Sequence, residues 1–362
     1  MRVLVANTGS SSLKLRLVGP DGELLAKLDA AAPGDRDAIA RFAGEHGADA
    51  VGHRIVHGRE LRDPALLDAD GIEELRRLTD LAPLHNGPAL RLVETLRRLL
   101  PDVPHVACFD TAFHAGMPDA AALYALPREW IERHGLRRYG FHGLSHSWAS
   151  RRAAELLGRP PRELRLVTCH LGAGASLAAV HGGRSVDTTM GFTPNEGLVM
   201  ATRSGSVDPG LLLWLIRDAG IDPDELEDAL EHRSGLAGLS GTSDMRELLG
   251  RLGDDERSRA AFDVYVHRLR SGIAAMAAAL GGLDALVFTG GVGEHAAPVR
   301  AAACSGLGFL GVRLDEERND RREADEDVAA PGATVRVLVV ESREDLEIAR
   351  LVRSALGADS AG

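Results

Sequence analysis

The chain has 362 residues, 44% of them hydrophobic, which is enough for two domains with cores of their own. Its net charge of −11 argues against a nucleic-acid partner held through phosphate contacts. The three cysteines, Cys108, Cys169 and Cys304, have no paired spacing, which excludes a zinc site or a disulfide framework and favours a reducing compartment.

The opening segment has the pattern of a strand, a tight turn and a second strand. An apolar run over residues 3–6 enters a turn of Asn, Gly and Ser, after which leucines at every second position alternate with Lys14 and Arg16. Such a turn can aim backbone N–H and hydroxyl donors at an anion such as phosphate. It is not a Walker A loop, because no Gly-Lys-Ser/Thr opens a helix. Since the strand begins at once, we expect no signal peptide.

The same pattern returns at residues 164–180, around the turn His170-Leu-Gly172-Ala-Gly174-Ala-Ser176. Further strands are expected at residues 51–56, 103–109, 283–289 and 335–340. Helices are expected at residues 72–81, 89–100, 145–157, 224–232, 257–280 and 343–356, with residues 83–88 as a breaker between the first two. This alternation indicates an α/β fold with an internal duplication, and a ligand cleft between the halves. Chance recurrence of two glycine turns is the alternative.

Two charged residues end predicted strands. Arg54, in His53-Arg54-Ile-Val56-His57-Gly58, can grip a carboxylate or phosphate with two hydrogen bonds, or form an ordinary surface ion pair. Asp110 stands where ligand groups collect in α/β folds and can hold Mg²⁺ directly or through water; the alternative is a helix N-cap.

Four later positions carry further chemistry, each with a plainer alternative. His142 can donate to a transferring phosphoryl group or be a satisfied, half-buried histidine. Arg203 can neutralise phosphoryl charge or be a solvated loop residue. The glycines of Gly290-Gly291-Val-Gly293-Glu294 can pack on an adenosine or make a plain turn. Glu344 can serve a metal or favour a helix N-terminus. No G-x-G-x-x-G fingerprint is present, which argues against a Rossmann fold.

Taken together, these segments resemble the acetate kinase family of the sugar kinase/Hsp70/actin superfold. The matching segments, in the family's order across nearly the whole chain, are Asn7-Thr-Gly-Ser10-Ser-Ser12-Leu-Lys14, His53-Arg54-Ile-Val-His57-Gly58, Ala82-Pro-Leu84-His85-Asn86, Phe109-Asp110-Thr-Ala-Phe-His114, Arg138-Tyr-Gly-Phe141-His142-Gly143, His170-Leu-Gly-Ala-Gly174-Ala-Ser176, Thr202-Arg203-Ser-Gly205, Ser240-Gly241-Thr-Ser243-Asp244 and Phe288-Thr-Gly-Gly-Val-Gly293-Glu294.

The resemblance implies two duplicated actin/Hsp70-like (RNase H-like) domains around a nucleotide cleft. Residues 1–111 plus 345–362 would form the acyl-substrate domain and residues 112–344 the nucleotide-binding domain. It implies the Mg²⁺-dependent reaction ATP + acetate ⇌ ADP + acetyl phosphate by direct in-line transfer, with Mn²⁺ as a substitute metal. It also implies a cytoplasmic homodimer with no nucleic-acid or membrane partner. Alternatives are a propionate or butyrate kinase, or a non-kinase nucleotide-binding protein of the same superfold.

Residue by residue, the resemblance implies these roles. The catalytic residues are Arg54, Asp110, His142 and Arg203, with His142 and Arg203 stabilising the transition state and His85 nearby. The substrate is bound by Arg54, Val56, Leu84, Phe141 and Pro194. The nucleotide is bound by Asn7, Ser10, Ser12, Lys14, His170, Gly172, Gly174, Asp244, Met245, Arg246, Gly291 and Gly293. Mg²⁺ is held by Asn7 and Glu344, with Asp110 acting directly or through water.

The chain departs from the family pattern at several places near the expected nucleotide. The family usually has Asn at the positions of Ala173, His295 and Arg343. It usually has Gly at the position of Ala201 and Asp at the position of Ser206. The chain is also shortened between Gly19 and Val51. Because Ala173 has lost a side-chain amide, the first turn, Asn7 to Lys14, is expected to carry more of the phosphate binding.

Overall fold

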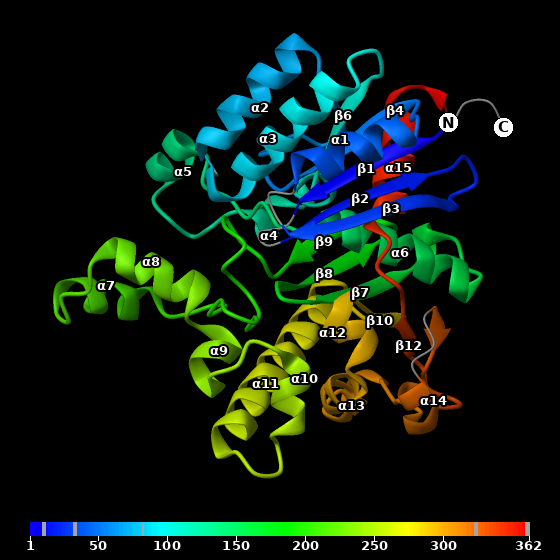
Figure 1. Ribbon diagram of the computed structural model, residues 1–362. Helices are drawn as coiled ribbons and strands as arrows, with labels where there is room; N and C mark the ends of the chain where they lie inside the picture. The colour runs from blue at the N-terminus through cyan, green and yellow to red at the C-terminus, as the bar shows by residue number, and fades with distance from the viewer. Residues whose placement is uncertain (9–11, 32–34, 82, 322–324, 359–362) are drawn as a thin grey trace. The chain divides into compact units, whose positions relative to one another are not determined.

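The computed structural model describes residues 1–8, 12–31, 35–81, 83–321 and 325–358 (Figure 1). The chain forms two compact units. Unit 1 comprises Met1–Ala115, Phe141–Trp148 and Arg343–Gly362, and unit 2 comprises Gly116–Gly140 and Ala149–Ser342. The functional division predicted above, with residues 1–111 plus 345–362 for the acyl substrate, stays a prediction.

The strands divide equally between the units. Unit 1 holds β1 (Val3–Thr8), β2 (Ser12–Val18), β3 (Leu24–Ala31), β4 (Ala50–Ile55), β5 (Ala65–Leu66) and β6 (His105–Phe109). Unit 2 holds β7 (Arg165–Leu171), β8 (Ala175–His181), β9 (Arg184–Thr188), β10 (Ala285–Thr289), β11 (Glu326–Asp327) and β12 (Arg336–Val339).

Helices fill the connections. Unit 1 has α1 (Arg36–Glu45), α2 (Ala69–Leu81), α3 (Pro83–Leu99), the 3₁₀ turn η1 (Ala112–His114), α15 (Glu344–Ala355) and the start of α6 (Gly143–Leu157), which continues into unit 2. Unit 2 has α4 (Asp119–Ala122), α5 (Arg128–His134), η2 (Pro161–Glu163), α7 (Pro209–Arg217), α8 (Pro223–His232), α9 (Gly235–Ser240), α10 (Met245–Gly250), α11 (Glu256–Ala279), α12 (Gly290–His295), α13 (Ala297–Ser305), η3 (Gly308–Leu310) and α14 (Glu316–Arg321).

The two sheets have the same topology. Unit 1 has the six-stranded order β3-β2-β1-β4-β6-β5, and unit 2 the order β9-β8-β7-β10-β12-β11. In each, three strands are parallel (β1, β4 and β6; β7, β10 and β12) and the other three are antiparallel to their neighbours. The predicted α/β fold with an internal duplication is confirmed.

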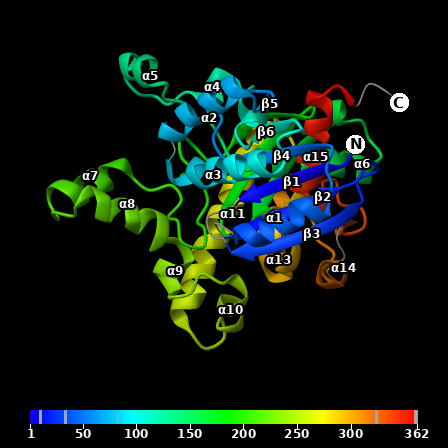
Figure 2. The same cartoon turned by 45° about the horizontal axis from the view of Figure 1, so that its top comes forward.

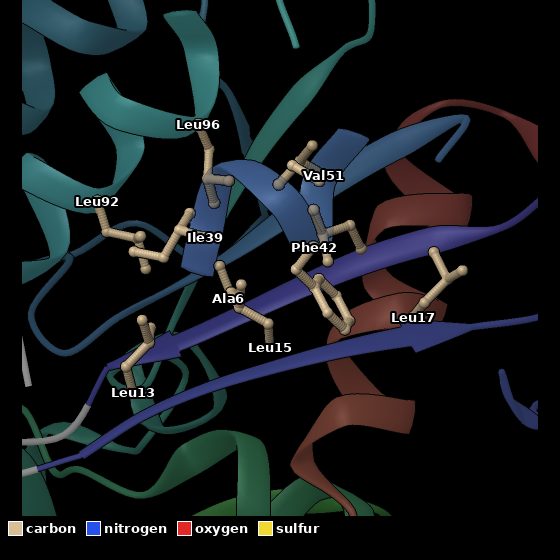
Figure 3. Packing of buried hydrophobic residues seen from close by; sticks show 11 residues of the cluster. Ala6, Leu13, Leu15, Leu17, Ile39, Phe42, Val51, Leu92 and Leu96 are labelled. Carbon is tan, nitrogen blue, oxygen red and sulfur yellow. The ribbon is translucent and has the colours of Figure 1, made fainter. Parts of the chain in front are cut away.

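Alternation along the strands builds the core of unit 1 on both faces of its sheet. On one face Leu4, Ala6 and the leucines of β2 pack against α1 and α3, as Figure 3 shows for Ile39, Phe42, Leu92 and Leu96. On the other face the alternate residues Val3 and Val5 pack against α15. The sheet is therefore buried between helices, and its strand ends are fixed in place.

In unit 2 the long helix α11 packs on β7, β8 and β9. Gly272 on α11 allows this close approach, because a Cβ there would lie 2.8 Å from Leu177 Cδ1. The helices α7 and α8 lie side by side in both views, and α8 leads directly into α9 (Figures 1 and 2). None of the helices among the described residues has the length and apolar character that a membrane span requires.

Several predicted element boundaries are wrong. The two helices expected at residues 72–81 and 89–100 are present as α2 and α3, but residues 83–88 belong to the second one. α3 starts at Pro83, where proline has no N–H to lose, and continues through Pro88. The predicted elements also lacked β3 and α1, which lie within the shortened region between Gly19 and Val51. The glycine run from Gly290 is itself the short helix α12.

Candidate active site

The polar centre of unit 1 is an ion pair between two parallel strands. Arg54 lies near the end of β4, and Asp110 directly follows β6 and extends the ladder by donating its N–H to Ile55 (2.9 Å). Nε and Nη2 of Arg54 donate to the two oxygens of the Asp110 carboxylate, at 3.1 and 2.6 Å. The side chains are only 14% and 1% exposed. This two-pronged geometry fixes the plane of the guanidinium.

Two further side chains complete this centre. Asn7, on the adjacent strand β1, accepts a hydrogen bond from Arg54 Nη1 at 3.2 Å and donates through Nδ2 to Glu344 Oε2 at 2.9 Å. Glu344 is the first residue of α15 and lies 3.9 Å from Arg54 Nε. Asn7 and Glu344 thus meet at one strand end, although they lie more than 330 positions apart in the sequence.

Burial and charge oppose each other in this centre. Burial works against the charged form of Arg54, but the carboxylates of Asp110 and Glu344 outweigh it and raise the pKa of the arginine. Burial likewise raises the pKa of Asp110, while the Arg54 guanidinium works against that rise. Some N–H groups of the Arg54 guanidinium have no acceptor among the described residues. Arg54 can therefore still donate hydrogen bonds to an oxygen of a bound anion.

Phe141 and His142 are attached to the same centre through backbone hydrogen bonds. The N–H of His142 donates to the Asp110 carboxylate, and the N–H of Gly143 donates to the Asp110 carbonyl at 2.9 Å. The buried His114 bonds through Nε2 to the Phe141 carbonyl at 3.1 Å, and burial lowers the pKa of His114 to about 4. A Cβ at Gly143 would lie 2.0 Å from the Asp110 carbonyl oxygen, so only glycine fits there.

The loop after β4 is held by a fully buried amide. Asn86 Oδ1 accepts from the N–H of His57 at 3.0 Å, and Asn86 Nδ2 donates to the His57 carbonyl at 2.9 Å. The His57 ring meets that of Phe141 edge-on, with centroids 5.6 Å apart. Val56, which precedes His57 in the chain, is half-buried, and like Phe141 it belongs to unit 1.

Arg203 belongs to unit 2 and is held differently from Arg54. It is half-buried, and burial lowers its pKa although Glu231 works against this. Within the described part of the chain its guanidinium hydrogen-bonds only to the Met200 sulfur, at 3.8 Å. A partly desolvated guanidinium with no carboxylate within hydrogen-bond distance among the described residues can accept an anion as its partner.

Unit 2 contains a pocket of about 460 Å³, within the range of roughly 300–1,000 Å³ common for small-molecule sites. Five predicted nucleotide-binding residues line it: Gly172, Asp244, Met245, Arg246 and Gly291. So do three of the departures from the family pattern, Ala173, Ala201 and His295. Leu236, Tyr265 and Pro298 also line it and were missed, since only the tertiary fold brings them to the glycine turns.

Two carboxylates, of Asp244 and Glu294, accept hydrogen bonds from the backbone that borders this pocket. The Asp244 carboxylate caps α10 by accepting from the N–H groups of Arg246 (2.7 Å) and Glu247 (3.4 Å), which lowers its pKa. The Glu294 carboxylate accepts from the N–H groups of Gly290 (2.9 Å) and Ser342 (3.0 Å). These bonds fix the helix start and the glycine turn that border the pocket.

The remaining predicted site residues either lie outside the described residues or do not line the pocket. Ser10 lies outside the described residues, as do the side chains of Ser12, Leu84 and His85. Lys14 is exposed on β2, and His170, Gly174 and Gly293 lie near the glycine turns but outside the pocket lining. Pro194 is buried in a loop of unit 2. The roles assigned to all these residues stay predictions.

The residues of the polar centre suit a magnesium ion that arrives with its own ligands. Among the described residues no group of three or more His, Cys, Asp or Glu side chains is arranged to hold a metal alone. Asp110 and Glu344 nevertheless offer carboxylate oxygens, and Asn7 an amide oxygen. Mg²⁺ prefers such hard donors and usually keeps waters and phosphate oxygens in its shell.

Two α/β units of identical strand order, together with these sites, define the class of actin/Hsp70-like phosphotransferases. The model of the Acetokinase family matches residues 36–350. The chain is 51% identical to the acetate kinase of Nostoc punctiforme, over 91% of this chain and 82% of that protein. The chain belongs to the acetokinase family.

Solved structures agree with this assignment. The crystal structure of Porphyromonas gingivalis acetate kinase superposes with a TM-score of 0.90 at 36% identity, covering 98% of this chain and 99% of the other. A propionate kinase from Francisella tularensis superposes equally well, with a TM-score of 0.90 at 34% identity, covering 97% and 98%. The fold is therefore shared by kinases named for different short acids.

Proposed function

We propose that this protein is an acetate kinase, which transfers the γ-phosphoryl group of ATP to acetate to give acetyl phosphate and ADP. The observation that carries the proposal is the buried Arg54 guanidinium, held flat by Asp110 in a chain of the acetokinase family. A fixed, desolvated guanidinium with N–H groups to spare suits a small carboxylate, because it can offer two parallel hydrogen bonds.

The proposed chemistry needs positioning and charge rather than a general base. Acetate is already ionised at neutral pH, so its oxygen can attack the γ-phosphorus in line without losing a proton. Arg54 orients the carboxylate, and Arg203 and His142 bind the oxygens of the transferring group as charge builds there. No covalent phospho-enzyme is required.

We propose Mg²⁺ as the metal, with Mn²⁺ as a substitute. Asn7, Asp110 and Glu344 would hold it, with Asp110 acting directly or through water. When bound, the metal offsets negative charge on the phosphate oxygens. We also propose that the pocket of unit 2 takes the nucleoside, because its lining combines glycine backbone with Met245 and the charged rim of Asp244 and Arg246.

Propionate is a second candidate acceptor, and the solved propionate kinase of the same fold favours it. We propose that Val56, Leu84, Phe141 and Pro194 enclose the methyl group. One extra methylene in such a pocket changes binding by only about 1–3 kcal/mol, so overlapping specificity is expected.

We further propose a homodimer in the cytoplasm. Its interface would involve α7, whose Leu211, Leu213 and Trp214 are 46%, 49% and 54% exposed and which has no buried residue. An apolar helix with no core of its own suits a second copy of the chain. The compartment is supported by the free, buried state of Cys108, Cys169 and Cys304.

The proposed function is tested by trapping the acyl phosphate with hydroxylamine. The enzyme is incubated with ATP, Mg²⁺ and acetate, propionate or butyrate, and the acyl hydroxamate is measured by colour. Acetate should give the highest kcat/KM, and Arg203→Ala should reduce it to background. A Lys substitution at the exposed Arg128, which among the described residues forms an ion pair with Glu132 only, is the matched control and should leave the rate unchanged. Tight ATP binding without carboxylate-dependent turnover would instead indicate a non-kinase nucleotide-binding protein.

A further inference from the structure

The backbone of His142 has an unusual conformation. Its φ is 56°, in the left-handed region that residues with a side chain rarely adopt. The residue directly precedes α6, and its carbonyl accepts the first helical bond, from the N–H of His146 at 2.9 Å. Residues at that position are normally extended. The left-handed backbone therefore turns the His142 side chain away from the direction it would otherwise take.

Such a conformation persists only where its surroundings impose it. The peptide groups around His142 are held on both sides. Its own N–H donates to the Asp110 carboxylate, and the next N–H, of Gly143, donates to the Asp110 carbonyl at 2.9 Å. On the preceding side, the Phe141 carbonyl is bonded by Nε2 of His114 at 3.1 Å.

His114 differs from the other partner, Asp110, because its side chain has no role assigned in binding or catalysis above. It is completely buried at the end of η1, where its N–H donates to the Thr111 carbonyl at 3.1 Å. Its ring stands edge-on to that of the buried His146, with centroids 5.7 Å apart. Because a carbonyl oxygen only accepts, Nε2 of His114 must carry the proton in this hydrogen bond.

We propose that His114 is a positioning residue, whose Nε2–H holds the Phe141 carbonyl and thereby keeps His142 in the left-handed conformation that aims its imidazole. This inference rests on the proposed role of His142 in phosphoryl transfer. It assigns His114 no contact with substrate. Its effect should appear in the chemical step, because misplacing a catalytic group by about 1 Å can cost 100-fold in rate.

The geometry of the side-chain donor gives a sharp test. In His114→Gln the amide nitrogen takes the place of Nε2 and can still reach the Phe141 carbonyl. In His114→Asn the amide nitrogen takes the place of Nδ1 and falls short, and His114→Leu has no donor. We expect kcat to fall about 100-fold in His114→Leu and His114→Asn, with KM for ATP and acetate changed less than about threefold. His114→Gln should retain kcat within about fivefold.

Val93→Ala is the control for stability alone. Val93 on α3 is fully buried and has no role assigned in the site, so its truncation should lower the melting temperature and leave kcat unchanged. Equal kcat in all three His114 variants, or a loss in His114→Gln as large as in His114→Leu, would overturn the proposal. If wild-type enzyme forms no acyl phosphate at all, the proposed function fails instead.

A second measurement needs no variant to be active. In protein labelled with ¹⁵N-histidine, the signal absent from His114→Gln belongs to His114. We expect the shifts of a neutral ring protonated at Nε2 in the wild-type protein at pH 7. A ring protonated only at Nδ1 could not donate to the Phe141 carbonyl and would contradict the proposal.

Discussion

At the scale of single residues, the hydrogen bonding of the polar centre in unit 1 depends on the planar shape of the Arg54 guanidinium. Arg54 donates to both oxygens of Asp110 and to Asn7, and a lysine ammonium cannot reproduce that planar fork. We predict that Arg54→Lys lowers kcat/KM for acetate at least about 100-fold. Loss of one preorganised hydrogen-bond donor in other enzymes lowers the rate by about 100- to 1,000-fold. Steady-state kinetics with acetate varied at saturating ATP measure this. Unchanged acetate kinetics would show that Arg54 does not hold the carboxylate.

Acid should destabilise the protein through its buried histidines. Burial lowers the pKa of His114 from 6.5 to about 4, so between these values the unfolded chain binds a proton that the folded protein does not. Stability should therefore fall as pH drops from about 6.5 to 4, by about 3 kcal/mol for this residue, and level off below. The lowered pKa values of His53 and His105 act in the same direction.

The measurement is the thermal midpoint between pH 4 and 7.5 in wild type and His114→Gln. The variant should show a shallower decline on the acid side, because glutamine does not titrate. Parallel curves would mean that His114 is not held neutral by the fold.

Single site residues could be predicted where a strand ends in a charged side chain. Arg54 and Asp110 were predicted from such positions, and they meet because β4 and β6 are neighbours. Asn86 and Tyr265 could not be assigned in the same way. The buried amide of Asn86 acts on the backbone of His57, and Tyr265 reaches its pocket from the middle of α11, so neither role leaves a local pattern.

At the scale of elements, α15 carries Glu344 to the centre and is held by close packing. Gly52 on β4 allows this, because a Cβ there would lie 2.6 Å from Ile348 Cγ2 and 2.7 Å from Val352 Cγ2. We predict that Gly52→Ala destabilises the protein by about 1–3 kcal/mol through overpacking and lowers kcat by displacing Glu344.

Gly44→Ala is the matched control, because a Cβ at this position on α1 meets nothing within 4 Å. Alanine there should be neutral or slightly stabilising. Urea unfolding and kcat measured on both variants decide the matter. Equal stability of the two variants would contradict the packing argument.

The apolar helix α7 should control the oligomeric state. We predict that Leu213→Glu converts the proposed dimer to a monomer, since the carboxylate would have to be buried unpaired in the interface. Leu25→Glu is the control and should remain dimeric, because Leu25 on β3 of unit 1 is as exposed as Leu213. Light scattering after gel filtration measures both masses. A wild-type protein that is already monomeric would contradict the proposal directly.

Element boundaries were predicted well where periodicity was strong and poorly where it was not. The alternation before Val18 gave the hairpin of β1 and β2, whereas α3 was cut short because Pro88 was taken as a breaker. Proline inside a helix is tolerated where tertiary packing compensates, and residues such as Leu92 and Leu96 supply that packing here. A sequence pattern does not reveal that compensation.

At the scale of the whole molecule, duplication is retained in topology while the two copies have diverged in chemistry. Both sheets have one strand order, but the charged centre lies in unit 1 and the pocket in unit 2. The recurring strand–turn–strand pattern allowed the duplication to be predicted. The pocket could not be predicted from the sequence, because its walls come from five helices, α9 to α13, and from the turns that carry Gly172 and Ala201.

The central claim is that a carboxylate oxygen of acetate accepts the γ-phosphoryl group of ATP. The most direct measurement is ³¹P NMR of the enzyme with ATP, Mg²⁺ and ¹⁸O-labelled acetate. With both oxygens of acetate labelled, we predict an acetyl phosphate resonance that depends on acetate and is shifted by one ¹⁸O bound to phosphorus, in the bridge to the carbonyl carbon. Inorganic phosphate released from ATP at the same rate with or without acetate, and no acetyl phosphate, would contradict it.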